Sequence, residues 1–441
     1  MKVRGVKSTP GHLLLLILSV ALAGCATTPQ WTQWGGPNRN FMVEATDLAD
    51  EWPEDGPPKL WHRELGDGYS TIAVQNGVLY TMYRTEQDEY TVALDAASGD
   101  TIWEHKNPSP TTGQMNQFGP GPHTTPLIVG NRLFSIGTNA VMHCYDKRTG
   151  DVLWKHDLPE EFGAPIPGYG YANSPILYKN TIIIPVDHPR PEEEEGEDAE
   201  EDAAEEEVVK EEVTEPQTLV AFDLKSGDVV WKNQDFKAHY ASPILIDFRG
   251  EEQLVLLMEA EMIGVNPNNG ELLWKHEFDP PGYHCAMPLW TADDILFVSA
   301  AYNIGSRAVQ LTKQDGKTVP KELWYSKKLR IHHGNAIPIG DHIYGSSGDF
   351  GTALVVCLDT KTGKAVWRKR GFAKATFVYA DGKLILFDEE GKLALVTATP
   401  EGLTVHSECK VAERTSWAAP TLVGKTLYVR DRRHIMAFDV G

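Results

Sequence analysis

A turn-like segment followed by a short run of alternating apolar and polar residues recurs five times in this chain. In each copy an Asp or Asn is followed four residues later by Gly, and a Trp lies four residues beyond the Gly. Asp or Asn can close a turn on its own backbone, Gly supplies a positive φ, and the alternation ending in Trp indicates an outgoing strand. The copies are Asp95–Gly99–Trp103, Asp146–Gly150–Trp154, Asp223–Gly227–Trp231, Asn266–Gly270–Trp274 and Asp359–Gly363–Trp367.

The spacing of these copies predicts an all-β fold, an eight-bladed β-propeller. The spacings from Trp103 to Trp154, from Trp231 to Trp274 and from Trp324 to Trp367 are 51, 43 and 43 residues, near the period of a four-stranded blade. A fifth unit, residues 286–324, opens a longer hairpin at Asp315-Gly316, and an eighth, residues 377–409, keeps the strand pattern without the Trp. Seven or nine blades would require a miscount at these degenerate units.

The two ends of the chain each carry half of one unit. The strand around Trp61 has the repeat's Trp but no turn before it, whereas Ala437-Phe-Asp439 matches Ala221-Phe-Asp223 and the sequence stops there. We therefore expect the N-terminal strand to pair in the last, C-terminal blade. Such pairing removes an open sheet edge, the standing hazard of β proteins.

The first residues have the form of a secretion signal. Lys2, Arg4 and Lys7 precede a short apolar run, and Leu22-Ala23-Gly24-Cys25 resembles a bacterial lipobox. We interpret residues 1–24 as a lipoprotein signal peptide, with lipidation at Cys25; ordinary secretion is the alternative. Ala26 in place of Asp favours the outer membrane, facing the periplasm. Residues 25–58 are then an N-terminal anchor and linker, and residues 59–441 the propeller.

The formal charge of −21 comes mostly from one segment. Residues 192–215 hold fifteen Asp and Glu against one Lys. The insertion 191–216 cannot bury enough apolar surface to fold and is predicted to be disordered. A solvated tail is favoured over a cation- or partner-binding arm. The rest of the surface is mildly acidic with no basic patch, so a nucleic acid is not an expected partner.

The remaining cysteines would lie in an oxidising compartment, where disulfides are allowed. Cys144 and Cys357 occupy the same repeat position in different blades, beyond disulfide reach, and Cys285 and Cys409 have no obvious partner. All four are predicted to be free thiols.

The motif Asp-x-x-[Ser/Thr/Asn]-Gly-x-x-x-Trp resembles that of the PQQ-like repeat propellers. This superfamily includes the quinoprotein alcohol dehydrogenases and the BamB-type lipoproteins of the outer-membrane assembly machinery, and the resemblance covers residues 59–441. It implies that each Trp docks between neighbouring blades. Quinoprotein dehydrogenases typically carry adjacent cysteines and a calcium-binding Glu, Asn and Asp set, which are not recognisable here. PQQ is therefore possible but disfavoured as a cofactor, and no catalytic residue is predicted.

One candidate binding site comes from aligning the repeats. Residues a few positions before each channel-lining strand should ring one mouth of the central funnel, and only one of each adjacent pair should face the channel. The candidates are Tyr69, His123, Tyr171, His239, Tyr240, His284, His332, His333, Asn335, Lys374, Arg414 and Trp417. Such a rim could bind an anionic or planar ligand, or a protein. His123, His239 and His284, at matched positions, could instead hold a transition metal; the simplest alternative is a polar mouth without a ligand.

These observations leave three functions open. The favoured one is a monomeric, non-catalytic scaffold on the periplasmic face of the outer membrane that engages a periplasmic or outer-membrane protein, as the BamB-type resemblance implies. A PQQ-dependent alcohol or sugar dehydrogenase is the alternative. A metal- or small-molecule-binding propeller is the third.

Overall fold

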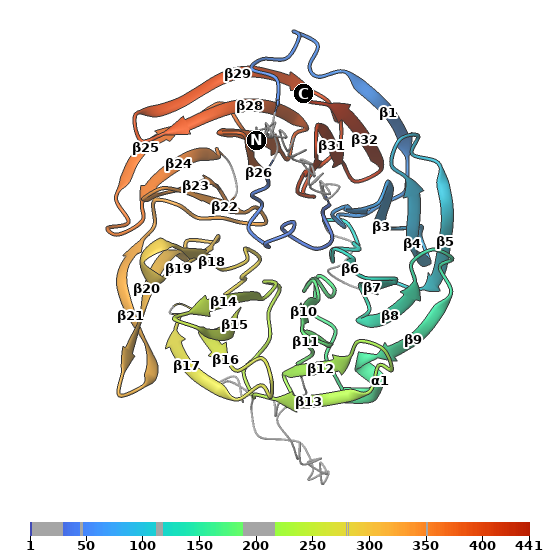
Figure 1. Ribbon diagram of the computed structural model, residues 1–441, viewed down its shortest axis with the longest axis vertical. Helices are drawn as coiled ribbons and strands as arrows, with labels where there is room; N and C mark the ends of the chain where they lie inside the picture. The colour runs from blue at the N-terminus through green and yellow to red at the C-terminus, as the bar shows by residue number, and fades with distance from the viewer. Residues whose placement is uncertain are drawn as a thin grey trace, which may run out of the picture.

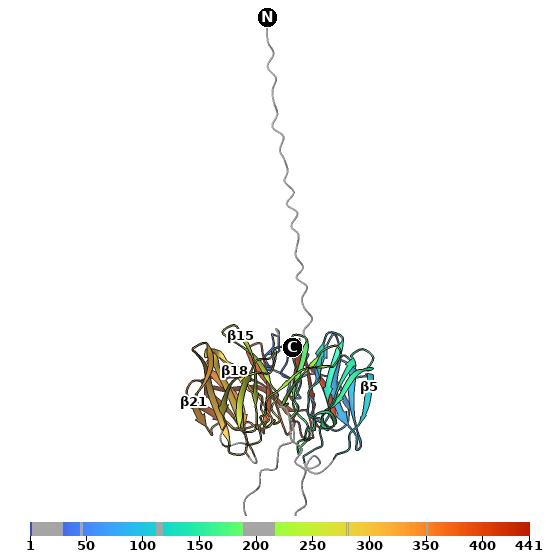
Figure 2. The same ribbon diagram turned by 90° about the horizontal axis from the view of Figure 1, so that it is seen from below.

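The computed structural model is a ring of eight four-stranded antiparallel sheets (Figure 1). It describes residues 1, 30–44, 47–111, 118–187, 217–278, 280, 282–349 and 352–441. Seen from the side, the sheets form a low ring with their strands running between its two faces (Figure 2). The eight-bladed propeller expected from the repeat is thus confirmed.

The blades follow chain order. Blade 1 holds β2 (Ala73–Gln75), β3 (Val78–Arg84), β4 (Asp88–Asp95) and β5 (Thr101–Pro108), and blade 2 holds β6 (Leu127–Val129), β7 (Arg132–Ile136), β8 (Val141–Asp146) and β9 (Val152–Asp157). Blade 3 holds β10 (Ile176–Tyr178), β11 (Thr181–Pro185), β12 (Leu219–Asp223) and β13 (Val229–Asn233), and blade 4 holds β14 (Ile244–Phe248), β15 (Glu251–Leu257), β16 (Glu261–Val265) and β17 (Leu272–Glu277).

The second half of the ring repeats this order. Blade 5 holds β18 (Leu289–Thr291), β19 (Ile295–Ala300), β20 (Gly305–Gln314) and β21 (Lys317–Ser326), and blade 6 holds β22 (Ala336–Ile339), β23 (His342–Ser347), β24 (Leu354–Asp359) and β25 (Ala365–Lys369). Blade 7 holds β26 (Ala375–Ala380), β27 (Lys383–Asp388), β28 (Lys392–Thr399) and β29 (Gly402–Lys410), and blade 8 holds β30 (Thr421–Val423), β31 (Thr426–Arg430), β32 (His434–Asp439) and β1 (Lys59–Glu64). The short helices α1 (Leu158–Phe162) and η2 (Ala292–Asp294) complete the described elements.

The repeat motif joins each blade to the next. In the turn after β4, the Asp95 carboxylate accepts the main-chain N–H groups of Ala97 and Ser98 at 2.9 Å each, and these bonds lower the pKa of Asp95. Gly99 follows with φ +78°. The Trp61 ring of blade 8 lies directly against Gly99, where any Cβ would collide with it.

The same contact recurs around the ring. Trp103 lies on Gly150, Trp154 on Gly227, Trp231 on Gly270 and Trp324 on Gly363. Trp103 and Trp324 also donate their indole N–H to a main-chain carbonyl of the neighbouring turn, at 2.9 and 2.8 Å. Glycine is needed here both for its positive φ and because a flat indole covers the position a side chain would take. Trp274 differs, since its indole N–H bonds Gln253 within its own blade at 2.7 Å.

The last blade is closed by the N-terminal strand. β1 pairs antiparallel with β32, with His62 opposite Met436 and Glu64 opposite His434. Figure 1 shows β1, in blue, lying beside β32, in red. The expected pairing of the two ends of the chain is present, and it supplies the outer strand that blade 8 lacks.

Residues 31–43, which we call the strap, cross the central channel at the face opposite the inter-blade connections. The strap is the dark blue segment in the middle of the ring in Figure 1. Trp31 exchanges main-chain hydrogen bonds with Val74 of blade 1, and Phe41 and Val43 bond the main chain of Tyr379 of blade 7. Between them, the buried Arg39 guanidinium donates to the carbonyls of Pro175 and Pro243 at 3.0 and 3.1 Å. Part of the segment expected as a linker thus closes one end of the channel.

Several sequence-based expectations fall outside the described residues. They are the signal peptide 1–24, the lipidation site Cys25 and the acidic insertion 191–216. Within the described ranges, none of the helices is long and apolar enough to span a bilayer. The four cysteines Cys144, Cys285, Cys357 and Cys409 are free thiols, as expected.

The contact between Trp and Gly gives a direct test of inter-blade packing. Gly363 and Gly382 both have positive φ, but only Gly363 faces a tryptophan ring, whereas a Cβ on Gly382 would meet open space. We expect Gly382→Ala to lower the free energy of unfolding by about 1 kcal/mol through backbone strain. Gly363→Ala adds overpacking and should cost about 3 kcal/mol. Equal losses in denaturant titrations would contradict this role for the glycine.

Candidate functional site

The connections that enter the inner strands of the eight blades surround a cup at one mouth of the channel. The cup has a volume of about 330 Å³. Its lining residues are Trp34, Tyr69, Thr71, Phe118, Gly119, His123, Tyr169, Ala172, Ser174, Tyr240, Ser242, Tyr283, Cys285, Tyr302, His332, His333, Lys374 and Trp417. Eleven of these eighteen side chains are aromatic rings, counting histidine, so the wall is mostly flat and apolar with polar edges.

One wall of the cup is a stack of rings. Tyr69 stacks on His123 with ring centroids 5.7 Å apart and on Trp417 at 5.0 Å. His333 lies over the same indole at 4.8 Å. The Tyr69 hydroxyl donates to the carbonyl of Phe118 at 2.5 Å, which fixes the ring in the stack.

The facing wall is built of tyrosines. Tyr169 lies 6.3 Å from Tyr240, Tyr240 lies 6.2 Å from Tyr283, and Tyr283 lies 5.9 Å from Tyr302, measured between ring centroids. His123 joins the two walls, since its Nε2 lies 3.0 Å from the carbonyl of Tyr169. Ring contacts therefore pass from blade to blade around most of the mouth.

Lys374 completes the circle and is the one cation among the lining residues. Its ammonium lies 5.7 Å from the Trp417 ring and 3.1 Å from the Glu389 carboxylate behind the wall. Trp417 donates its indole N–H to the same carboxylate at 3.0 Å. Burial opposes ionisation of Glu389, but the neighbouring His333, the Trp417 N–H and the Lys374 charge outweigh it and lower the pKa of Glu389 to about 2.

The histidines of the cup are neutral at physiological pH. Burial lowers the pKa of His123 to about 4, and burial with the nearby His333 and Lys374 lowers that of His332 to about 3. An ammonium can only donate, so the His332 Nδ1, 3.4 Å from Lys374 Nζ, accepts. The His332 Nε2 then carries the proton and donates to the Tyr302 hydroxyl oxygen at 2.6 Å.

The strap supplies the base of the cup. Trp34 lines the cup and packs edge-on against Phe41, with ring centroids 5.0 Å apart. Arg39 of the same segment donates to the main-chain carbonyl of Ser174, and Ser174 also lines the cup. In the described part of the chain no carboxylate pairs with Arg39, and burial lowers the pKa of its guanidinium to about 9.

The structure brings seven of the twelve predicted rim residues into the lining of the cup. They are Tyr69, His123, Tyr240, His332, His333, Lys374 and Trp417. In the pair His239–Tyr240 it is Tyr240 that faces the cup, and beside His284 it is Cys285. The expectation that only one of two neighbours faces the channel holds at both places, but it is wrong at His332 and His333, which both line the cup.

The other five predicted residues point elsewhere. Tyr171 is 4% exposed and donates to the carbonyl of Pro185, inside the core of blades 2 and 3. His284 is fully buried against Phe278, with its Nε2 2.9 Å from the Glu259 carbonyl, and His239 accepts the His284 main-chain N–H.

Asn335 and Arg414 are the remaining two. The Asn335 amide bonds both the N–H and the carbonyl of Phe377 at 2.8 Å, so it joins blades 6 and 7. Arg414 is exposed and does not line the cup. Among the described residues no group of three or more His, Cys, Asp or Glu is placed to hold a metal ion. His123, His239 and His284 are therefore not brought together as a ligand set.

Sequence reasoning missed Trp34, Phe118, Tyr169, Tyr283 and Tyr302. Tyr169 and Tyr283 lie one or two positions before the aligned residues, in connections whose lengths differ between blades. Phe118 lies in the long connection between β5 and β6, and Tyr302 lies in the turn between β19 and β20 rather than before an inner strand. The enrichment of tyrosine and phenylalanine just before the inner strands was the available signal.

The depressed histidine pKa values predict a dependence of stability on pH. The folded protein keeps these rings neutral, while the unfolded chain protonates them near pH 6.5, so the unfolded state binds more protons below that pH. Stability should fall as the pH drops from about 6.5 towards 4. We expect His332→Gln to reduce the slope of unfolding free energy against pH by up to about 1.4 kcal/mol per pH unit. Tyr302→Phe removes the same hydrogen bond but no group that titrates in this range, so it should leave the slope unchanged. Equal slopes in the unsubstituted protein and both variants would contradict the assignment of this pH dependence to His332.

Sequence relatives of this chain are short matches to two kinds of protein. A segment of 101 residues, 21% of the chain, is 29% identical to methanol dehydrogenase [cytochrome c] subunit 1 of Paracoccus denitrificans and covers 16% of that protein. A segment of 162 residues, 34% of the chain, is 24% identical to the outer membrane protein assembly factor BamB of Alteromonas naphthalenivorans and covers 37% of it. The matched parts therefore span well under half of either relative.

Solved structures share the fold at low sequence identity. BamB from Moraxella catarrhalis aligns with a TM-score of 0.56 at 14% identity, covering 86% of this chain and 97% of that one. The quinohemoprotein alcohol dehydrogenase of Comamonas testosteroni aligns with a TM-score of 0.52 at 13% identity, covering 95% and 82%. These likenesses concern the propeller fold alone.

The family comparison extends over most of the propeller. The model described as outer membrane protein assembly factor BamB matches residues 87–369 and again residues 312–441. The two matches overlap, as a repeat allows, and together they run from blade 1 to the C-terminus. The chain belongs to this BamB family of PQQ-like repeat propellers.

Proposed function

We propose that this protein is a non-catalytic scaffold of BamB type, anchored by a lipid on Cys25 to the periplasmic face of the outer membrane, that binds a polypeptide partner at the cup. The observation that carries the proposal is the nearly continuous circle of aromatic rings at one mouth of the channel. Tyr and Trp are enriched among the residues that dominate protein–protein binding energy.

The exposure of the rim supports a protein partner. Phe118, Tyr283 and Tyr302 are 43%, 45% and 38% exposed, although each is a large ring. They stand around a concave, mostly uncharged surface, whose centre a partner side chain could enter. A depletion of charge at the centre with aromatic rings around it is the composition of an interface core.

The anchor and the location are supported by the sequence and by the family. Cys25 follows a lipobox-like sequence. Two relatives are named outer membrane protein assembly factor BamB, from Alteromonas naphthalenivorans and Xanthomonas campestris. By analogy with these relatives, we place this protein in the cell envelope as a monomer, beside the assembly machinery that their names describe.

A small ring compound held in the cup is the second candidate. The cup's volume falls within the range of small-molecule sites, and Lys374 could orient an acceptor group. Calcium with PQQ does not fit these walls, because the described lining holds no carboxylate and Glu389 behind it is engaged by Lys374 and Trp417. No reaction step is therefore assigned to the cup.

The proposal can be tested by placing a photo-crosslinking amino acid at single positions in the full-length lipoprotein in its native membranes. We expect crosslinks from Tyr283, on the rim, to one discrete envelope protein. The matched control is Val405, 37% exposed on the outer strand β29. The rim substitution Trp417→Ala should weaken that crosslink about tenfold or more, as for a binding hot spot.

Two outcomes would contradict the scaffold proposal. One is the absence of any polypeptide crosslink at the rim. The other is a Cys25→Ala variant that, once exported, stays with the outer membrane. If a ring compound is recovered with the protein and no polypeptide is crosslinked, the result favours the second candidate function, the binding of a small ring compound in the cup.

A further inference from the structure

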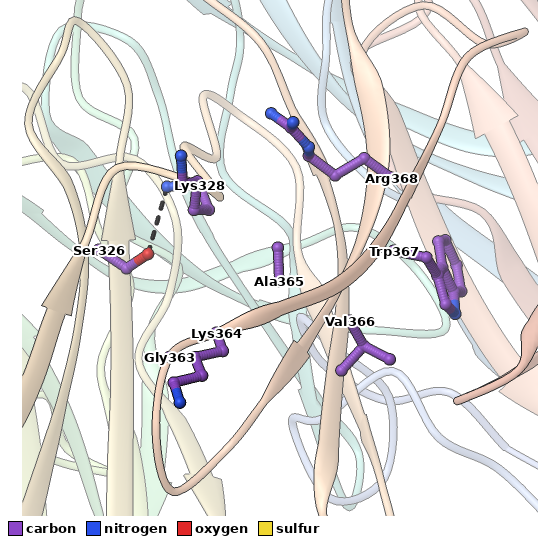
Figure 3. Close-up of a pocket in the computed structure, with 8 residues that line it drawn as sticks. All are labelled: Ser326, Lys328, Gly363, Lys364, Ala365, Val366, Trp367 and Arg368. Carbon is purple, nitrogen blue, oxygen red and sulfur yellow. Dashed lines mark hydrogen bonds between the residues drawn. The ribbon is translucent and has the colours of Figure 1, made fainter.

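A second hollow lies on the outer flank of the ring, away from the cup. Figure 3 shows it between the end of β21 and the strand β25, and we call it the flank groove. Ser326, Lys328 and residues 363–368 line it, and its volume is about 620 Å³. It therefore runs along the outer strand of blade 6, on the side that faces blade 5.

The flank groove is basic in a chain whose formal charge is −21. Lys328, Lys364 and Arg368 line it and are exposed, and no acidic residue is among its lining. Within the described ranges none of these three cations forms an ion pair. The chain holds 62 acidic residues against 41 basic ones, so three neighbouring cations without a carboxylate are a local reversal of its charge. Unpaired like charges destabilise the isolated protein slightly and favour an anionic partner.

The same place offers an open sheet edge. β25 pairs with β24 and, among the described strands, with no other. Its far edge thus presents main-chain N–H and C=O groups that a further strand could bond. Trp367 donates to the Thr399 carbonyl of blade 7 at 2.8 Å, so Arg368, which follows it, lies on the other face of the strand. Val366 is the extra residue of a β-bulge opposite Cys357 and Leu358. Val366 is 43% exposed and provides an apolar contact between Lys364 and Arg368.

Apolar exposure alone does not distinguish this strand. Leu60, Ile102 and Val230 on other outer strands are 51%, 49% and 53% exposed. The residue after the Trp is a glutamate in β5, Glu104, and a lysine in β9, β13 and β17, namely Lys155, Lys232 and Lys275. What β25 adds is a hollow beside the edge with cations on both of its sides.

We propose that the flank groove is a docking site for an acidic, extended polypeptide segment, which adds as a strand to the free edge of β25. Acidic side chains of the segment would face Lys328, Lys364 and Arg368, and an apolar side chain would cover Val366. Main-chain bonds supply affinity in strand addition, and the side-chain pattern supplies specificity. This site is separate from the cup, so it does not depend on the function proposed there.

An acidic strand suits the groove better than a lipid surface does. A bilayer would attract the cations but would leave the edge of β25 and its N–H groups without partners. An anionic peptide satisfies both the charges and the edge. A second copy of this chain would bring an outer strand that lacks matching acids, because the outer strands of the described blades carry Lys, Arg or His beside most of their acids.

The test uses the full-length protein and a fluorescent, end-capped nine-residue peptide of alternating glutamate and valine. We expect binding by fluorescence anisotropy at low salt that weakens at 0.5 M salt, as surface charge interactions are screened. The double variant Lys364→Glu/Arg368→Glu should raise Kd at least about tenfold, since like charges then oppose the peptide. The matched control Lys155→Glu, at the equivalent position after Trp154 in blade 2, should leave Kd unchanged.

Three further measurements separate the possible occupants. Bound peptide should slow amide hydrogen exchange in β25, and the same peptide with proline at the valine positions should not bind. Equal binding by the proline peptide would overturn strand addition. If the protein binds phosphatidylglycerol vesicles but not the peptide, and the double variant weakens vesicle binding, the groove is instead a contact site for a lipid surface. Dimerisation that the double variant abolishes, again without peptide binding, would assign it to a second copy.

Discussion

The structure depends on one packing constraint: no blade can bury its faces alone, so each must be sealed by the next one around the ring. At five of the eight junctions the seal is the tryptophan of one blade lying on the glycine turn of its neighbour, as Trp103 does on Gly150. For eight blades to be sealed, the last must reach the first. Trp61, on the N-terminal strand, does this by lying on Gly99 and donating to the Ala96 carbonyl at 3.0 Å. The closing strand therefore completes a sheet and a contact at once.

The strap lies on the path of the chain towards this closing strand. Before β1 reaches the outer edge of blade 8, the chain crosses the ring at the face opposite the cup. Along this path Leu48 bonds Asp381 and Trp52 bonds Ser407, both in blade 7. The strap uses the crossing to fill one end of the channel, with Arg39 satisfying carbonyls that the inner strands leave unpaired. A channel open at both ends becomes a cup with one mouth.

The fold could be predicted almost completely from the sequence, and the site only in part. The turn residues and tryptophans repeat because every blade has the same packing problem, so their spacing gives blade number and closure. The cup follows no such repeat. Strand alternation leaves two choices at each connection, and local packing decides between them: His284 turns into the core against Phe278, whereas Cys285 faces the cup. Because the connections differ in length, Tyr169 occupies the lining position expected for Tyr171. Trp34 belongs to the strap, which lies outside the repeat.

The cup and the flank groove differ in chemistry. The cup is a nearly neutral enclosure of rings whose one lining cation is balanced by Glu389, and the flank groove is a charged hollow beside an open edge. A propeller with two such surfaces can hold two partners at once, which is the property a scaffold needs.

Amide hydrogen exchange of residues 59–64 in the native full-length protein tests closure most directly. Pairing of β1 with β32 predicts that these amides are protected as strongly as those of the other outer strands, such as β9, and that they lose protection together with β32 as denaturant is added. Exchange of residues 59–64 at the rate of an unstructured peptide, with the rest of blade 8 still protected, would contradict the account.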